Sequence, residues 1–199
     1  MKFLSKTERS QILNENLTYQ EGKSEHNRKI KELLLTEQKN FCAYSEKYIQ
    51  ELDSSEVEHF NTSLKYSDDY YNYYAVIRKA NLYKKDEEYK GASFFNSLFF
   101  QNSDEFNERI QYVKGGIYEE IKEDDQEAID LIDFLGFNHP DLYTQRIRHI
   151  KRLKKSFEDA SYSKEQCLEY FRNHHEELSF ITAIENELGL DLSEFSAID

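Results

Sequence analysis

The sequence predicts an α+β fold that is mostly helical, and three observations predict it. Apolar residues recur at three- and four-residue steps in several segments, which is the spacing of amphipathic helices. Strand-like runs occur at 55–60 and on both sides of Gly115-Gly116, which is the pattern of a strand and a hairpin. The 14 Phe and 15 Tyr can close a compact core, although only 38% of the 199 residues are hydrophobic.

We expect one domain with helical additions. Its expected parts are an N-terminal arm at 1–23, a core at 24–90, a hairpin and helical C-terminal part at 91–190, and an acidic tail at 191–199. One Pro and six Gly argue against a linker-rich or disordered chain.

The first elements lead up to a polar stretch at 41–85. The arm shows no periodic pattern and is expected to hold at most one short helix. A helix should follow at 25–38, with Leu33 and Leu34 facing inward. The residues Cys42-Ala43-Tyr44-Ser45 should form a tight turn.

The best strand candidate is 55–60, because its residues alternate. Val57 and His59 share one side of it, and Glu58 and Phe60 share the other. Residues 61–69 are polar and should form a loop. A helix is then expected over 70–85, where Tyr73, Val76, Ile77 and Ala80 recur at helical steps.

The second half of the chain is expected to begin with a hairpin. Its strands would be 109–113 and 117–118, joined by Gly115-Gly116. A helix at 124–135 should follow and end at Gly136, since glycine suits the position just after a helix.

Two longer helices are expected after Pro140, at 141–160 and 164–188. Ser163 and Gln166 form a capping-box pattern at the start of the second. Gly189 should end it, and the acidic tail with Asp191, Glu194 and Asp199 is expected to be loose.

Composition points to a cytoplasmic protein without a membrane segment. The first residues lack the apolar region of a signal peptide, and no apolar run approaches the ~20 residues of a membrane span. Cys42 and Cys167 stand far apart, so no disulfide framework is expected. The net charge of −13 has two possible explanations. One is ordinary solubility, and the other is a DNA-acting subunit that takes its DNA affinity from a partner.

Five residues of the stretch 41–85 suit phosphodiester hydrolysis: Glu58, His59, Asn72, Asn81 and Lys84. Such hydrolysis needs a base to activate water and a cation to hold developing charge. A neutral imidazole such as His59 titrates near working pH, while Glu58 and the Asn81 amide offer oxygen ligands to a hard divalent ion. Lys84 lies one turn after Asn81 and can reach a phosphate, and Asn72 can hold the loop or the imidazole. The alternative is that the histidine is structural and the asparagines merely exposed.

The stretch resembles the HNH endonuclease family, which has a ββα-metal fold. It is most similar to a bacterial branch whose motif reads CAYC, then veHf, then NL, then C-x-x-C-N-x-x-K. The matching residues are Cys42-Ala43-Tyr44-Ser45, Val57-Glu58-His59-Phe60, Asn72 and Asn81-Leu82-Tyr83-Lys84. The similarity continues through 112–117 and 131–138, with Leu142 and Arg146, and so covers roughly 27–185.

This resemblance implies roles for the residues. His59 would be the general base, Asn81 a metal ligand, Glu58 a ligand or orienting acid, and Asn72 a positioning residue. Lys84 and its neighbour Lys85 would contact phosphate, and the metal would be Mg²⁺ or Mn²⁺.

The resemblance also implies partners. The branch includes the nuclease subunit of Septu-type and some retron anti-phage systems, where it accompanies an ABC/SMC-like ATPase and acts on DNA. We therefore expect a hetero-oligomer. The alternative is a catalytically inactive, structural or regulatory subunit of the same kind of complex, and a DNA or an RNA target both stay open.

The chain departs from the family at the zinc-binding cysteines. The four family positions hold Cys42, Ser45, Ile77 and Ala80, so only one thiolate ligand remains. A tetrahedral zinc site needs four ligands, and we expect no structural zinc. Ile77 and Ala80 facing Tyr44 would replace the metal by hydrophobic packing.

Four other features have competing interpretations. The segment 146–155 holds six Lys or Arg and no acid, so it is a contact for DNA or an acidic partner, or an ordinary solvated helix with an apolar stripe. His174-His175 is expected to be solvated rather than a metal pair. Tyr70–Tyr74 favours core packing over base stacking, and the acidic segment 119–130 favours a solvated face over docking on a basic ATPase surface.

Overall fold

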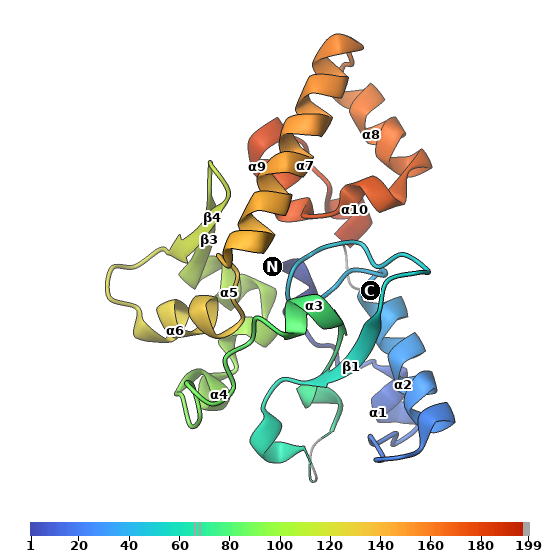
Figure 1. Ribbon diagram of the computed structural model, residues 1–199, viewed down its shortest axis with the longest axis vertical. Coiled ribbons are helices and arrows are strands. Elements are labelled where there is room, and N and C mark those ends of the chain that lie inside the picture. Colours follow the sequence, from blue (N-terminus) through green and yellow to red (C-terminus); the bar gives the residue numbers. More distant parts are fainter. Residues whose placement is uncertain (66, 68, 197–199) are drawn as a thin grey trace.

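The computed structural model describes residues 1–65, 67 and 69–196, and it confirms an α+β fold in which helices predominate (Figure 1). The strands form two separate antiparallel sheets of two strands each. One consists of β1 (Ser55–His59) and β2 (Tyr73–Ile77), and the other of β3 (Ile110–Val113) and β4 (Ile117–Glu120).

The N-terminal arm packs into the core. It holds the 3-10 turn η1 (Lys2–Leu4) and the short helix α1 (Gln11–Asn14). Phe3 stacks on Phe41 with 4.4 Å between ring centroids, and Leu4 is fully buried. Because these partners lie far apart in the sequence, no local periodicity indicates the contact.

Helix α2 (Ser24–Glu37) confirms the helix expected at 25–38. It buries Ile30 and Leu34 and packs against β1 and β2. The next residue, Gln38, is buried as well. Its side-chain amide donates to the Ala75 carbonyl and accepts from the Ala75 N–H, both at 2.8 Å.

The strand expected at 55–60 is confirmed as β1. It pairs with β2 so that Ser55 lies opposite Ile77 and His59 opposite Tyr73. The loop between the strands contains the 3-10 turns η2 (Thr62–Leu64) and η3 (Tyr70–Asn72), and α3 (Arg78–Asn81) follows β2 directly.

The helix expected over 70–85 is wrong, because the chain forms η3, β2 and α3 there. The four successive residues Tyr73, Tyr74, Ala75 and Val76 are all 0% exposed. Successive residues point all around a helix, so a helix could not bury all four against one surface. A strand covered on both faces can, and such a strand reads as a continuous apolar run.

An aromatic cluster holds the end of β1. Phe60 stacks on Phe100 at 4.3 Å and meets Phe134 edge-on at 5.3 Å. Such ring pairs contribute about 0.5–1.5 kcal/mol each beyond the area they bury. Phe60 directly follows β1, Phe100 lies in η4 (Phe99–Gln101), and Phe134 ends α6 (Gln126–Phe134). Phe94 of α4 (Phe94–Ser97) also meets Phe60, at 6.2 Å.

The hairpin and the acidic helix are confirmed. After α5 (Ser103–Arg109), β3 and β4 pair on either side of Gly115-Gly116, whose φ angles are +104° and +98°. Glycine adopts such positive φ angles readily, and a Cβ on Gly116 would also require the end of the Ile147 side chain, 2.5 Å away, to move. Helix α6 is followed by Gly136 with φ +61°, as expected.

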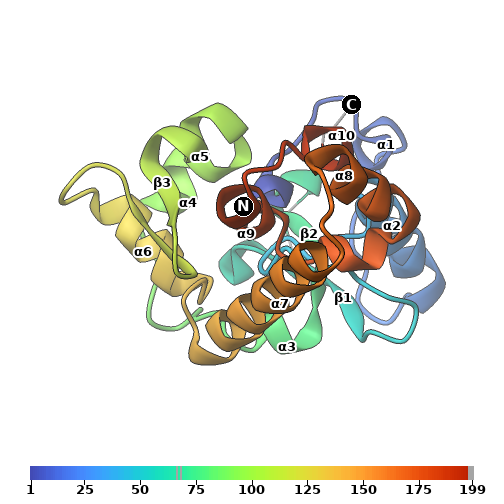
Figure 2. The ribbon, with the colours of Figure 1, turned by 90° about the horizontal axis from the view of Figure 1, so that it is seen from above.

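The helix expected at 141–160 is confirmed as α7 (Pro140–Asp159), which packs against α9 (Ile181–Leu188). Its first turn lies beside α3 (Figures 1 and 2). The predicted capping box of Ser163 and Gln166 opens α8 (Lys164–Asn173).

The single helix expected over 164–188 is wrong. The chain breaks into α8, the 3-10 turn η5 (His175–Leu178) and α9. Leu178 and Phe180 are both buried, although on one helix they would lie about 200° apart. The left-handed φ of +64° at Phe180 turns the chain so that both side chains reach the core.

The tail expected to be loose is packed as far as residue 196. Leu192 is fully buried, and α10 (Ser193–Ser196) follows it. Glu194 pairs with Arg172 of α8 at 3.0 Å, while Asp199 lies outside the described residues. Over the described part of the chain, none of the helices combines the length and the apolar character that a membrane crossing requires.

Candidate functional site

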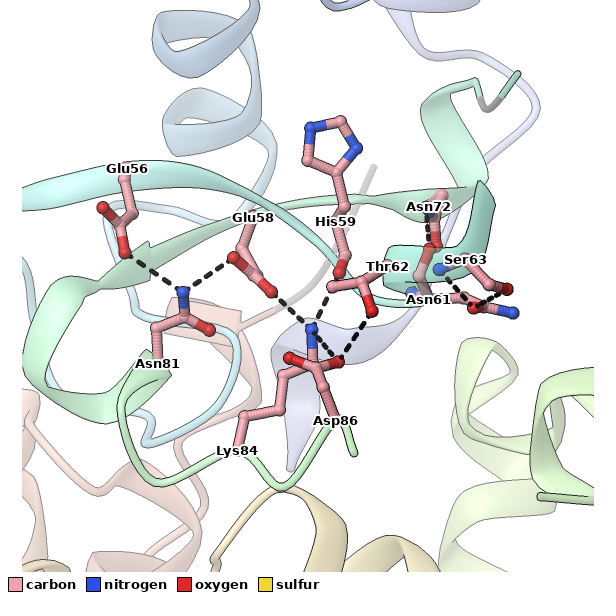
Figure 3. Close-up of polar contacts among 10 residues, drawn as sticks. All are labelled: Glu56, Glu58, His59, Asn61, Thr62, Ser63, Asn72, Asn81, Lys84 and Asp86. Carbon is pink, nitrogen blue, oxygen red and sulfur yellow. Dashed lines mark hydrogen bonds and ion pairs between the residues drawn. The ribbon is translucent and has the colours of Figure 1, made fainter. Parts of the chain in front are cut away.

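The candidate site is divided between the two faces of β1. Side chains alternate along a strand, so Glu56 and Glu58 point to one face and Val57 and His59 to the other. Figure 3 shows the His59 ring pointing away from the side on which Glu58 and Asn81 meet. We call the side of Glu56, Glu58, Asn81 and Lys84 the polar face and the side of His59 the aromatic face.

The polar face brings together two residues that the sequence singled out. The Asn81 side-chain N–H donates to Glu58 Oε2 at 2.7 Å and to Glu56 Oε1 at 3.1 Å (Figure 3). The contact depends on the succession β1, β2, α3: β2 returns antiparallel to β1, and α3 then carries Asn81 back beside it.

Lys84 is buried on the same face, and its side chain is only 1% exposed. Its ammonium forms an ion pair with Glu58 and another with Asp86 at 3.0 Å, and it donates to the His59 carbonyl at 2.8 Å. Two carboxylates and a carbonyl therefore replace the water that the buried charge has lost.

Lys85 lies outside this cluster. Its ammonium pairs with Asp133 at 2.8 Å on the partly exposed surface, and the hydrogen bond to Asp133 raises the pKa of Lys85. Phosphate contacts by Lys84 and Lys85 stay predictions, and both ammonium groups have carboxylate partners in this structure.

His59 points to the face of β1 opposite to that of the Glu56 and Glu58 carboxylates. Its ring is 6% exposed and meets the ring of Tyr19 edge-on at 4.7 Å and that of Tyr73 at 5.4 Å. Tyr19 belongs to the N-terminal arm, which covers this face. A general base must reach within hydrogen-bonding distance of the water it activates, so the base role of His59 stays a prediction.

Asn72 closes the loop that joins β1 to β2. Its Oδ1 accepts from the Asn61 N–H at 2.7 Å, and its Nδ2 donates to the Asn61 carbonyl at 3.0 Å. Its own carbonyl accepts from the Phe60 N–H at 2.8 Å. Asn72 therefore fixes the backbone just after His59, which is the loop-holding role that the sequence left open beside a contact with the imidazole.

Three of the four residues at the positions of the expected zinc ligands are buried, namely Cys42, Ser45 and Ala80, and Ile77 is half-buried. Cys42 begins the expected turn, which the Glu46 N–H closes by donating to the Cys42 carbonyl at 2.9 Å. The Ile77 N–H donates to Cys42 Sγ at 3.3 Å, and burial raises the pKa of this thiol. Ala80 and Tyr44 are buried in the same cluster. Ile77 packs against this large core as well, while the direct packing of Ile77 and Ala80 on Tyr44 and the lack of structural zinc stay predictions.

Sequence reasoning missed Glu56, Asp86 and Tyr19. Glu56 could have been found, because a residue two positions before Glu58 on a strand shares its face. Asp86 stands in a run of charged residues that looks like ordinary surface. Tyr19 reaches His59 across 40 positions of the sequence, and no local pattern indicates such a contact.

The polar face offers oxygen donors of the kind that Mg²⁺ takes. Over the described residues, no group of three or more His, Cys, Asp or Glu side chains is arranged to hold a metal. Glu56 and Glu58 do converge on one point, the Asn81 amide nitrogen, and turning that amide would place a third oxygen there. Mg²⁺ binds through one or two carboxylates and keeps several waters, so these residues fit it, with the Lys84 ammonium as a competitor for Glu58.

The tyrosine cluster Tyr70–Tyr74 was expected to pack in the core, and the pair His174-His175 was expected to be solvated. Tyr70, Tyr73 and Tyr74 are at most 2% exposed and belong to the core. Tyr71 instead lines an open pocket of about 480 Å³ beside Asn72. Both His174 and His175 are exposed.

Comparisons of the chain with protein-family models, with curated proteins and with solved structures found no match.

Proposed function

We propose that the chain is a metal-dependent HNH-type DNA endonuclease, acting in the cytoplasm as the effector subunit of an anti-phage complex with an ABC/SMC-like ATPase. The observation that carries the proposal is the succession β1, β2, α3, which brings the Glu58 carboxylate within 2.7 Å of the Asn81 amide. These residues are 23 positions apart, so the fold and not local sequence makes the contact. Together they supply the carboxylate and amide oxygens that a divalent ion needs.

The other residues have roles that their surroundings support in part. Glu58 and Asn81, with Glu56 beside them, would hold Mg²⁺ or Mn²⁺, which would supply a positive charge for the developing phosphate anion. Asn72 holds the loop after His59. For His59 to act as the base, its ring must leave Tyr19 and turn towards the polar face.

Lys84 requires a second rearrangement. Its ammonium must leave Glu58 before it can contact a phosphate, because the carboxylates on this face now take its charge. The chain as it stands is therefore in a resting arrangement, and binding of a partner or substrate supplies the free energy for the change. The net charge of −13 agrees with a subunit that relies on a partner for DNA affinity.

The test is metal-dependent DNA cleavage by the chain purified together with the product of the neighbouring gene, which the proposal expects to be an ATPase. We expect cleavage with Mg²⁺ or Mn²⁺ that a chelator abolishes, and His59→Ala should reduce the rate by about 10²- to 10⁴-fold. His174→Ala, an exposed histidine away from the site, is the matched control and should cleave like wild type. Equal cleavage by wild type and His59→Ala would exclude His59 as the base.

A second function is favoured by the position of His59. With its ring held between Tyr19 and Tyr73, and with Lys84 already paired to Glu58, the domain can serve as an inactive structural or regulatory subunit of the same complex. Calorimetric titration of Mn²⁺ into the complex separates the two functions. Binding that Glu58→Gln abolishes supports the nuclease, whereas no binding together with no cleavage supports the structural subunit.

A further inference from the structure

The outer face of α7 carries a group of basic side chains with few acidic partners. The helix buries Leu142, Arg146, Ile150, Leu153 and Phe157 along one side. At 3.6 residues per turn, Arg148, Lys151 and Lys155 lie on the opposite side, with Lys154 next to them. All four are exposed, and we call them the α7 basic face.

The six basic residues of the segment 146–155 differ in their contacts within the fold. Arg146 is 2% exposed, and its guanidinium donates to the carbonyls of Gly116 and Phe137, so it joins the hairpin to α7. Arg152 is paired with Glu177. The two residues are thus committed within the fold, which leaves the basic face as the free part of the segment.

Three members of the face have no ion pair within the described part of the chain: Arg148, Lys151 and Lys154. Lys155 pairs with Asp159 at 2.9 Å, an exposed contact of the kind that contributes little. Acidic residues stand only at the ends of α7, with Asp141 at the start and Glu158 beside Asp159 at the end. On a chain with a net charge of −13, two middle turns with only positive exposed charge form a local exception.

The face lies next to the element that carries Asn81. The first turn of α7 is fixed to α3 and the residues after it. Asp141 accepts from Tyr83 at 2.8 Å and pairs with Lys79 at 3.1 Å, and the Tyr83 ring stacks on His139 at 3.7 Å. Arg148 is seven residues beyond Asp141, which is about 10 Å along the helix axis. Figure 1 shows the first turn of α7 near α3 and the rest of the helix extending away from it, so a chain of phosphates that leaves α3 can continue along α7.

We propose that the α7 basic face binds the phosphate backbone of the nucleic acid that enters the site between β1 and α3. The choice of nucleic acid among polyanions rests on the proposed function. Lysine and arginine bind phosphate by charge, releasing condensed counterions, and carry no sequence information in doing so. The face therefore supplies sequence-independent affinity and orients the backbone towards Asn81.

The test is binding of a short labelled DNA duplex to the full chain, followed by fluorescence anisotropy in buffer with a chelator, so that no cleavage occurs. The triple variant Arg148→Glu/Lys151→Glu/Lys154→Glu should weaken binding on the order of tenfold or more at low salt. The plot of log affinity against log salt concentration should become less steep by about 2 to 3, since each lost phosphate contact removes roughly 0.9 from its slope.

A matched control separates the face from net charge. Lys23→Glu/Lys90→Glu/Lys114→Glu changes the net charge by the same amount at three exposed lysines outside the face. It should retain near wild-type affinity. An equal loss in both triple variants, or wild-type affinity in the α7 variant, would overturn the proposal. If the α7 variant unfolds, Arg148→Gln/Lys151→Gln/Lys154→Gln replaces it and should show an intermediate loss.

Two further outcomes are decisive. A wild-type chain that does not bind the duplex at low salt overturns the inference, and so does preferential binding to vesicles of anionic phospholipid. Because binding is measured without metal, the result is separate from the cleavage assay. DNA binding through this face in a protein that never cleaves would leave the inference standing and remove the proposed nuclease function.

Discussion

The two faces of β1 hold their polar groups in different ways. On the polar face, the Glu58 carboxylate forms an ion pair with the Lys84 ammonium and accepts a hydrogen bond from the Asn81 amide. On the aromatic face, the His59 ring is held by the rings of Tyr19 and Tyr73. One strand thus presents an electrostatic cluster and a packed ring at adjacent residues. The Lys84 ammonium also donates to the His59 carbonyl, so the two faces share one backbone contact, but their other side chains can be altered separately.

The largest expected effect comes from removing charge on the polar face. Glu58→Ala leaves the Lys84 ammonium, whose side chain is 1% exposed, without its closest carboxylate. Breaking such a buried pair costs about 3–5 kcal/mol of unfolding free energy. Chemical denaturation measures it.

The control is to remove both partners. Glu58→Leu/Lys84→Met should be less destabilised than Glu58→Ala, because no buried charge is left alone. Glu56→Ala should lose less unfolding free energy than Glu58→Ala, since among the described residues the Glu56 carboxylate meets only the Asn81 amide, at 3.1 Å. A loss below about 1 kcal/mol in Glu58→Ala would mean that Asp86 and the His59 carbonyl hold Lys84 by themselves.

A smaller effect is expected on the aromatic face. Tyr19→Ala removes the ring that covers His59 and should lower the free energy of unfolding by about 2 kcal/mol, as for a partly buried aromatic. It should also expose the imidazole. Diethyl pyrocarbonate should then modify His59 faster than in wild type, as peptide mass spectrometry can measure.

Tyr143→Ala is the matched control for that variant. Tyr143 is 38% exposed and lies on α7, away from His59. The rate of modification at His59 should not change in it. An unchanged rate in Tyr19→Ala as well would show that Tyr73 and the backbone alone shield the imidazole.

A third effect is a dependence of stability on pH, and it concerns a lysine without the charge matching of the polar face. Lys6 lies over the rings of Tyr70 and Tyr74 at 4.3 and 3.9 Å, and burial lowers its pKa to about 7 against the attraction of Glu37 and Asp69. The unfolded chain, with an ordinary pKa of 10.5, therefore binds the proton more readily between these values. Unfolding free energy should rise with pH above 7 by about 1.4 kcal/mol per pH unit from this group.

Comparison with Lys6→Met isolates that contribution. Denaturation at several pH values between 7 and 10 should show a wild-type stability that gains on the variant as pH rises. A difference between the two proteins that is constant with pH would mean that Lys6 keeps an ordinary pKa, with water reaching its ammonium.

Much of the fold could be predicted because its cues are local. The alternation of 55–60, the glycines of the β3–β4 hairpin and the Ser163 capping box each act over a few residues, and all three are confirmed. The strand β2 was missed because it is covered on both faces. A run of buried residues fits a helix or a strand equally well when its covering elements are unknown.

In the candidate site, too, features with local cues could be predicted and features that depend on distant contacts could not. The side on which Glu58 lies follows from alternation within β1, whereas its meeting with Asn81 depends on the return of the chain through β2, where a helix was expected. Three features depend on contacts across long stretches of sequence: the Tyr19 cover, the pairing of Lys84 with Asp86 and Glu58, and the internal place of Arg146. Spacing carries no information about such contacts, since they arise only when the elements pack.

The Gln38 side chain also determines how the β1–β2 sheet can grow. By pairing with both the N–H and the carbonyl of Ala75, it acts as a strand one residue long along the outer edge of β2. Exposed strand edges invite pairing with other chains, and this edge is already closed at its middle. A third strand could not be added there without expelling a buried amide, so the sheet that carries the site stays two strands wide.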